Sequence, residues 1–157
     1  MSIDVGDKAP QFSLPGSGDE TISLPTDGST STVLYFYPKD DTPGCTVEAK
    51  DFTALADDFA ELNCMIVGAS KDTPAKHDKF IAKHQLNVKL VSDETGLLME
   101  NYGVWVEKNL YGRIYMGIER ATYLIGADGN IKNIWRKVRV KGHAAKVLEA
   151  AKGLTLS

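Results

Sequence analysis

The chain has 157 residues, 43% of them hydrophobic, a size and composition that suit one globular domain with a core of ordinary size. Its net charge of -3 arises from 18 basic and 21 acidic residues without any run of five like charges, which disfavours nucleic acid and membrane surfaces as partners. Its apolar stretches are far shorter than the roughly 20 residues that cross a bilayer, and residues 1–16 lack the pattern of a secretory signal, so we expect a cytoplasmic protein with one domain over residues 1–157.

The first predicted strand, residues 31–38, is rich in β-branched and aromatic side chains and stops at Pro38. Beyond a polar loop, residues 45–62 place apolar side chains three to five positions apart, which is the period of an amphipathic helix. These side chains are Val47, Phe52, Leu55, Phe59 and Leu62. We therefore expect this helix to pack against a sheet.

A second strand is predicted at residues 64–70, which form a short apolar run. Thr73 and Pro74 then have the character of an N-cap and a first helical position, so a helix is expected to run from there to about Gln85. Residues 88–93 supply a third strand.

Residues 94–103 predict a short helix closed by Gly103, since glycine relieves the left-handed conformation just past a last turn. Residues 120–138 hold two β-rich runs around Ala-Asp-Gly-Asn, a strong hairpin signal. A final helix is expected at about residues 143–152, ending at Gly153. The alternation of strands and helices predicts an α/β fold with a central mixed β-sheet flanked by α-helices.

Cys45 is expected where the helix of residues 45–62 begins, at the carboxyl end of the first strand, which is where open α/β sheets bind ligands. The positive end of a helix dipole and unpaired backbone amides stabilise a thiolate there. Pro43 and Gly44 shape the turn without covering the sulfur, and Thr42 adds a hydroxyl. The alternative is an ordinary junction between loop and helix, with Thr42 as a cap. Because position 42 is not cysteine, the paired thiols of a disulfide reductase are missing.

The stretch PKDDTPGCTVEA resembles the peroxiredoxin active-site pattern Pro-x-x-x-Thr-x-x-Cys, met by Pro38, Thr42 and Cys45. The residues of this stretch are similar to those typical of one subfamily, the bacterioferritin comigratory protein or peroxiredoxin Q subfamily. The resemblance covers nearly the whole chain, and the segment YMGIERATYLIGADGNI is similar to the one that carries the family's active-site arginine, here Arg120.

This resemblance implies a thioredoxin-like fold and reduction of hydrogen peroxide or organic hydroperoxides without a metal, haem or flavin. Cys45 would attack the peroxide and become a sulfenic acid, while Arg120 would stabilise the thiolate and the leaving oxygen. Thr42 would hydrogen-bond the peroxide, and Pro38 would shield the sulfur and shape the pocket. Pro43 and Gly44 would belong to the substrate-binding turn.

Two side chains of the expected site have a second interpretation. Glu48 either holds Arg120 or the loop in place, as part of the substrate-binding region, or complements the helix dipole as an acidic residue near the helix start, the reading we favour slightly. Arg120 could instead form a surface ion pair, but its apolar and strand neighbours favour a position facing the site.

The chain departs from its relatives in the thiol that would resolve the sulfenic acid. Many members of the subfamily carry a second cysteine five residues after the first, where this chain has Lys50, and others carry it on the next helix, where this chain has none. The remaining thiol, Cys64, is disfavoured as a resolving thiol because a cysteine beside Met-Ile-Val is usually a small buried hydrophobe. We therefore expect a one-cysteine enzyme reduced by an external thiol such as glutathione, glutaredoxin or thioredoxin. A redox sensor and a non-catalytic binding module with the same fold are the alternatives.

The histidines suggest a metal at first sight. His77 and His84 are seven apart on a predicted helix, but neither they nor His143 has further ligands at a recognised metal spacing. We expect exposed helix histidines and no metal or other cofactor. The resemblance implies that the aromatic stretch 104–118 is a loop and a strand near the active site, hence a pocket wall or a partner contact. It also favours a monomer over a dimer.

Overall fold

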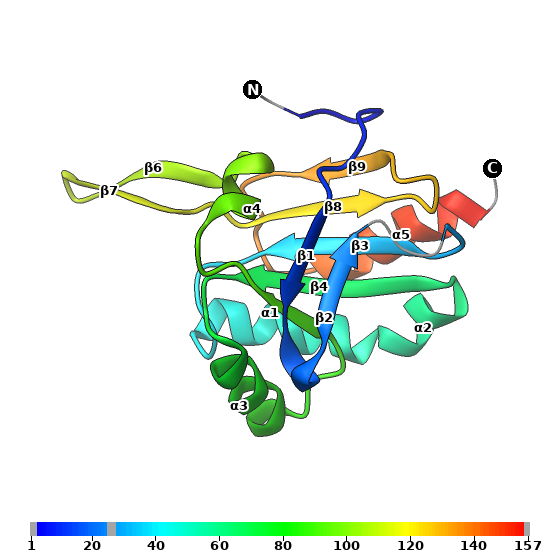
Figure 1. The fold of residues 1–157 in the computed structure, drawn as a ribbon, viewed down its shortest axis with the longest axis horizontal. Coiled ribbons are helices and arrows are strands. Elements are labelled where there is room, and N and C mark those ends of the chain that lie inside the picture. The colour runs from blue at the N-terminus through cyan, green and yellow to red at the C-terminus, as the bar shows by residue number, and fades with distance from the viewer. Residues whose placement is uncertain (1–2, 25–27, 156–157) are drawn as a thin grey trace.

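The computed structural model describes residues 3–24 and 28–155 and is built on a mixed sheet (Figure 1). The strand order is β5-β4-β3-β8-β9. The strands are β3 (Ser31–Phe36), β4 (Cys64–Ser70), β5 (Lys89–Ser92), β8 (Ala121–Ile125) and β9 (Ile131–Trp135). β3, β4 and β5 run parallel, whereas β8 and β9 are antiparallel to their neighbours. The predicted central mixed sheet is confirmed.

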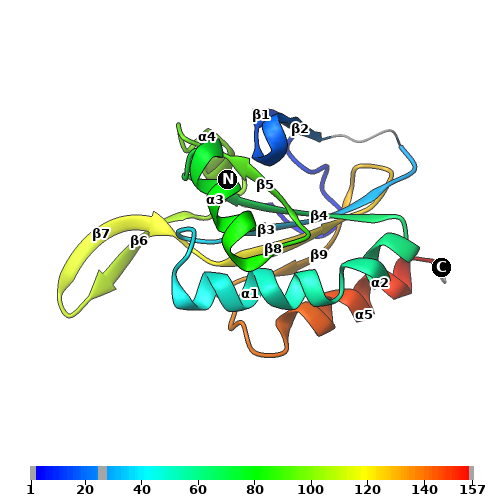
Figure 2. The same ribbon diagram turned by 90° about the horizontal axis from the view of Figure 1, so that it is seen from below.

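Helices cover both faces of this sheet, as Figure 2 shows for the face of the long helices. The helices are α1 (Pro43–Ala54), α2 (Ala56–Glu61), α3 (Pro74–His84), α4 (Leu97–Asn101) and α5 (His143–Thr155). α1, α2 and α5 lie together on one face, and α3 packs beside the edge strand β5. None of the helices in the described ranges has the length and apolarity that a membrane span needs.

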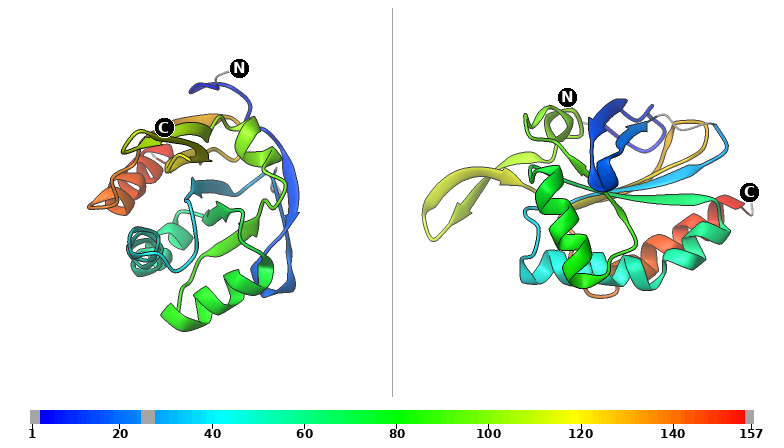
Figure 3. Two further views of the ribbon diagram at one scale, coloured as in Figure 1. Left: turned by 90° about the vertical axis from the view of Figure 1, so that its left-hand side faces the viewer. Right: turned by 60° about the horizontal axis from the view of Figure 1, so that its bottom comes forward.

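The strand β3 and the residue after it are buried on both sides, which explains their nearly continuous apolar sequence. Val33, Tyr35 and Tyr37 point into the core beneath α1 and α5. Leu34 and Phe36 point into a second core on the opposite face, which α4 and the N-terminal strands cover. Figure 3 (left) shows this separation, with α1 (cyan) and α5 (red) on one side and the blue N-terminal strands on the other.

Three predicted helices differ from the structure, one of them only in being shorter, since α4 covers Leu97–Asn101 within the predicted residues 94–103. The helix predicted over residues 45–62 is divided at Leu55, where φ is -103° and ψ is 6°. The Leu55 N–H bonds to the Phe52 carbonyl three residues earlier at 3.1 Å, so the last turn of α1 tightens and α2 starts in a new direction. The final helix also continues through Gly153 to Thr155, because one glycine in a last turn costs only about 1 kcal/mol.

Two hairpins were not predicted. The first pairs β1 (Phe12–Pro15) with β2 (Thr21–Leu24) around the short 3-10 turn η1 (Ser17–Asp19). The second pairs β6 (Trp105–Leu110) with β7 (Arg113–Ile118) and projects from the body of the molecule (Figure 1). Its turn residues Tyr111 and Gly112 both have positive φ. Asn-Gly is the usual sequence signal for such a turn, and Tyr-Gly is not, so the hairpin could not be predicted from these residues.

Candidate active site

Cys45 lies in the first turn of α1, just beyond the carboxyl end of β3. Thr42 is the N-cap residue, and its carbonyl accepts from the Thr46 N–H at 2.8 Å. Pro43 fills the first helical position, where no N–H is needed. The first-turn amides of Gly44 and Cys45 have no acceptor within the helix, and the sulfur therefore lies at the positive end of the helix. The residue is only 2% exposed.

Arg120 reaches this thiol although 75 positions separate the two residues. It precedes β8, whose antiparallel register with β3 sets Ala121 opposite Phe36 and so brings Arg120 to the carboxyl end of β3. Its Nη2 donates to Cys45 Sγ at 3.3 Å. Gly44 permits this approach, because a Cβ at that position would lie 3.3 Å from Nη2.

Glu48 is the second partner of the guanidinium. It lies three residues after Cys45, hence on the same face of α1, and is 1% exposed. Its Oε1 accepts from Arg120 Nη1 at 2.6 Å, so one nitrogen of the fork faces the sulfur and the other faces the carboxylate. Glu48 therefore holds Arg120, and the reading that we favoured slightly, an acid that only complements the helix dipole, is wrong for this buried side chain.

Burial is the largest influence on the pKa values of Glu48 and Arg120. Desolvation raises the pKa of Glu48 to about 7, and Arg120 lowers it by less. For Arg120, desolvation lowers the pKa, but the charges of Glu48 and Cys45 together raise it above its ordinary value. The arginine therefore stays charged, while Glu48 exchanges its proton near neutral pH.

We predict a pH-dependent contribution of Glu48 to stability. Its folded pKa of about 7 exceeds the unfolded value of 4.5, so the stability it contributes is complete below pH 4.5 and is lost as pH rises through 7. Urea denaturation from pH 4 to 8 should show the free energy of unfolding of wild type falling by about 3 kcal/mol relative to Glu48→Gln. Burial lowers the pKa of His143 to about 4, which makes stability rise with pH. This opposite effect is present in both proteins and cancels when wild type is compared with Glu48→Gln. A pH-independent difference would contradict the prediction.

The other residues expected at the site surround the start of α1. Thr42 does not cap the helix with its side chain; its hydroxyl donates to the Lys39 carbonyl at 2.9 Å, which leaves the oxygen free to accept from a ligand. Pro38, Pro43 and Gly44 are exposed. The described site thus offers an acceptor at Thr42 and an arginine at the sulfur.

A buried polar network holds the loop between β3 and α1. Asp40 accepts from the Tyr37 hydroxyl through one oxygen and meets His77 Nδ1 at 2.6 Å through the other. Its own N–H donates to Asp72 Oδ2 at 2.8 Å. His77 Nε2 lies 3.1 Å from the Val91 carbonyl, so both ring nitrogens face acceptors. The loop that carries the N-cap of α1 is therefore tied to α3 and β5.

The expectation of exposed helix histidines is wrong. His77 is fully buried and His143 is 4% exposed, while the His84 side chain is 16% exposed and binds Asp41. The partners of His77 come from other segments, so no spacing along the helix could show them. The ligating atoms of Asp40, Asp72 and His77 also lie within 4.8 Å of one another. This set could receive a metal ion only by giving up the Asp40–His77 hydrogen bond.

We predict that His77→Ala lowers the free energy of unfolding by about 2 to 3 kcal/mol, because it leaves the buried Asp40 carboxylate with one of its two partners. His84→Ala is the matched control: its partner Asp41 is 41% exposed, so the loss should stay below about 1 kcal/mol. Chemical denaturation of both variants measures the difference. Equal losses of unfolding free energy in the two variants would show that the buried Asp40–His77 pair contributes no more to stability than the exposed His84–Asp41 pair.

Cys64 lies far from this site. It starts β4, where it pairs with Ser31 at the amino end of β3, whereas Cys45 follows the carboxyl end. The six residues of β3 span about 20 Å, and a disulfide needs Cα atoms within about 7 Å. Cys64 is 6% exposed, and burial raises its pKa to about 12. The prediction of a small buried thiol is confirmed.

The projecting hairpin forms one wall of a cavity beside Arg120. The cavity has a volume of about 460 Å³ and is lined in part by apolar side chains of Val106, Leu110, Tyr115 and Val138. The aromatic stretch therefore contributes to a pocket wall, one of the two roles expected for it, although it folds as two strands.

Comparison with known proteins places this site in a family. The sequence profile of the AhpC/TSA family matches residues 5–134. Peroxiredoxin Bcp of Bacillus subtilis is 46% identical over 155 residues, which cover 99% of each chain. A putative peroxiredoxin bcp of Coxiella burnetii is 45% identical over 148 residues, 94% of this chain and 98% of the relative.

Solved structures agree with the sequence relatives. The bacterioferritin comigratory protein of Xanthomonas campestris, studied for its alkyl peroxide reduction activity, superposes with a TM-score of 0.86 at 42% identity over 90% of each chain. A cysteine mutant of PrxQ from Xylella fastidiosa superposes with a TM-score of 0.91 at 37% identity over 99% of each chain. The thioredoxin-like fold is thereby shown. The chain belongs to the AhpC/TSA family of peroxiredoxins, in its bacterioferritin comigratory protein and peroxiredoxin Q branch, and is a thiol peroxidase.

Proposed function

We propose that Cys45 is the peroxidatic nucleophile and that it reduces hydrogen peroxide and organic hydroperoxides through a sulfenic acid. The observation that carries this proposal is the 3.3 Å contact from Arg120 Nη2 to Cys45 Sγ at the N-terminus of α1. A helix N-terminus and a guanidinium both stabilise negative charge, which the sulfur has before the reaction and the leaving oxygen acquires during it.

In the proposed reaction the Cys45 thiolate attacks the terminal oxygen of the peroxide. The sulfur–oxygen bond forms as the oxygen–oxygen bond breaks, the sulfur is oxidised to S–OH, and hydroxide or alkoxide leaves and takes up a proton. Arg120 stabilises the charge as it moves from sulfur to the leaving oxygen. Thr42 accepts from the peroxide hydroxyl and so aligns the bond for attack, since its own hydrogen is donated to Lys39. Pro38 limits water at the sulfur, while Pro43 and Gly44 leave room for the substrate.

We propose a one-cysteine cycle completed by an external thiol, whether glutathione, glutaredoxin or thioredoxin. Support comes from the separation of Cys64 from Cys45 along the full length of β3, and from Lys50 at the position where many relatives have a second thiol. The first thiol displaces water from the sulfenic acid and forms a mixed disulfide. A second thiol then releases Cys45 as the reduced thiol.

The cavity beside Arg120 supports organic hydroperoxides as substrates in addition to hydrogen peroxide. Its apolar side chains Val106, Leu110 and Tyr115 suit an alkyl group attached to the leaving oxygen. The two unpaired thiols suit a reducing compartment, so we place the protein in the cytoplasm, acting as one domain and favouring a monomer.

Steady-state peroxide consumption with a panel of thiol donors tests the proposed function. We expect turnover with at least one of the three donors and with both classes of peroxide. Rapid oxidation of Cys45 without turnover would identify a redox sensor. Absence of both oxidation and turnover would identify a binding module.

A further inference from the structure

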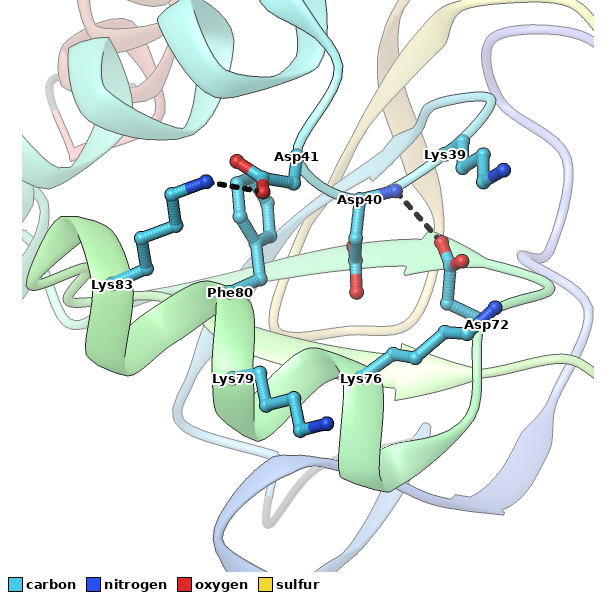
Figure 4. A pocket seen from close by; sticks show the side chains of 8 residues that line it. All are labelled: Lys39, Asp40, Asp41, Asp72, Lys76, Lys79, Phe80 and Lys83. Carbon is cyan, nitrogen blue, oxygen red and sulfur yellow. Dashed lines mark hydrogen bonds and ion pairs between the residues drawn. The ribbon is translucent and has the colours of Figure 1, made fainter.

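A second cavity lies between the loop before α1 and the helix α3. It has a volume of about 350 Å³, within the usual range of sites for small molecules. Four lysines border it, Lys39 from the loop and Lys76, Lys79 and Lys83 from α3, and Phe80 contributes an apolar wall (Figure 4). The three lysines of α3 are spaced by three and four residues and therefore occupy one face of the helix.

The four lysines around this cavity outnumber its three carboxylates, Asp40, Asp41 and Asp72. Lys83 binds Asp41 at 2.7 Å, but Lys39, Lys76 and Lys79 form no ion pair within residues 3–24 and 28–155. Clustered like charges repel one another, and an anion in the cavity would relieve that repulsion.

Of the three carboxylates in the cavity wall, Asp41 pairs with Lys83, and Asp40 and Asp72 form no ion pair with a lysine in the part of the chain that the structure describes. Asp40 directs its two oxygens to Tyr37 and His77. Asp72 uses Oδ2 to bind the Ser70 hydroxyl and the Asp40 N–H. Figure 4 shows the second of these bonds as a dashed line between Asp40 and Asp72. The open side of the cavity therefore presents three ammonium groups that are unpaired among the described residues, beside the Lys83–Asp41 ion pair.

We propose that this cavity binds the carboxylates of a low-molecular-weight thiol. This proposal rests on the proposed reduction of Cys45 by an external thiol. The volume of about 350 Å³ admits a ligand of tripeptide size. The ammonium groups would hold its carboxylates, and Phe80 would contact its apolar part. A small thiol with carboxylates is thus the reductant class that fits.

The position of the cavity suits delivery of a thiol to Cys45. Its wall includes Asp41, four residues before Cys45, and four residues span at most about 14 Å. An extended tripeptide is about 10 Å long, which is comparable to this upper limit, so a thiol anchored at the Asp41 end of the cavity would approach the sulfur once the loop admits it. Its sulfur then attacks the sulfenic sulfur; a sulfur–sulfur bond forms, the sulfur–oxygen bond breaks, and the hydroxide leaves as water with the proton of the incoming thiol.

Charge reversal at α3 tests the proposal kinetically. The probes are reduced glutathione and its diethyl ester, which has the same thiol without free carboxylates. We expect the double variant Lys76→Glu/Lys79→Glu to lower the rate of reduction by glutathione about tenfold, while reduction by the ester and oxidation by peroxide stay unchanged. The control, Lys50→Glu/Lys146→Glu, makes the same change of net charge outside the cavity and should retain the wild-type preference. An equal loss with both thiols, or no loss, would overturn the proposal.

A binding experiment separates this site from the peroxidase activity. S-methylglutathione has the carboxylates but cannot reduce Cys45, and titration calorimetry should show saturable binding to wild type that weakens at high salt and is lost in Lys76→Glu/Lys79→Glu. If no thiol supports turnover while this binding persists, the proposed function fails and the carboxylate site stands. If turnover is normal but S-methylglutathione does not bind, the carboxylate site is refuted and the peroxidase stands.

Discussion

Replacing Cys45 with serine is expected to abolish peroxide reduction, with a loss of about 10⁴-fold or more. A serine hydroxyl is not ionised at neutral pH and cannot form the sulfenic acid, so Arg120 would stabilise no nucleophile at the start of α1. Peroxide consumption with an excess of external thiol measures the effect.

Cys64→Ala is the matched control for this variant, because it removes the other thiol of the chain at the opposite end of β3. Its activity should stay within about twofold of wild type, although the lost packing lowers stability by about 1 kcal/mol. A Cys45→Ser protein that still consumes peroxide, or a Cys64→Ala protein that loses turnover as completely, would contradict the assignment.

Arg120→Met should lower the second-order rate of Cys45 oxidation by about 10² to 10³-fold, the usual cost of removing one donor that stabilises charge in a transition state. The variant loses both the contact to Cys45 Sγ and the only cation in the described structure that binds Glu48. Arg120→Lys should recover part of the rate, since it keeps the charge but lacks the fork that faces two partners.

Stopped-flow mixing with hydrogen peroxide, followed by tryptophan fluorescence, gives this rate directly. Urea denaturation of the same samples shows whether Arg120→Met is folded. Oxidation of a folded Arg120→Met protein at the wild-type rate would show that the guanidinium has no part in the reaction.

The parts of the fold that sequence predicted well are those specified by local signals. β4 matches residues 64–70 at both ends, and α3 starts after the expected Thr73 cap, whose hydroxyl accepts from the Lys76 N–H at 3.2 Å. Such caps and apolar runs act within a few residues. The division of a predicted helix at Leu55 shows the limit of periodicity, because the apolar spacing continues across the break.

The candidate site could be predicted only in part for the same reason. Position along the chain places Cys45 at the sheet edge, but Arg120 was assigned through the family resemblance, and its contact with the sulfur depends on the register of β8 against β3. Asp40 and His77 gave no local signal at all, since their pairing joins a loop to a helix 37 residues later. Burial of charged side chains is a tertiary property that this sequence did not reveal.

The one-cysteine cycle follows from the lack of a second thiol near Cys45, and the product of Cys45 oxidation tests it most directly. Wild-type protein is treated with one equivalent of hydrogen peroxide and analysed by intact-mass and peptide mass spectrometry, with dimedone added to trap the sulfenic acid. We expect a gain of one oxygen, or of one dimedone, on the peptide that contains Cys45. A loss of two hydrogens with the Cys45 and Cys64 peptides linked would contradict the one-cysteine cycle.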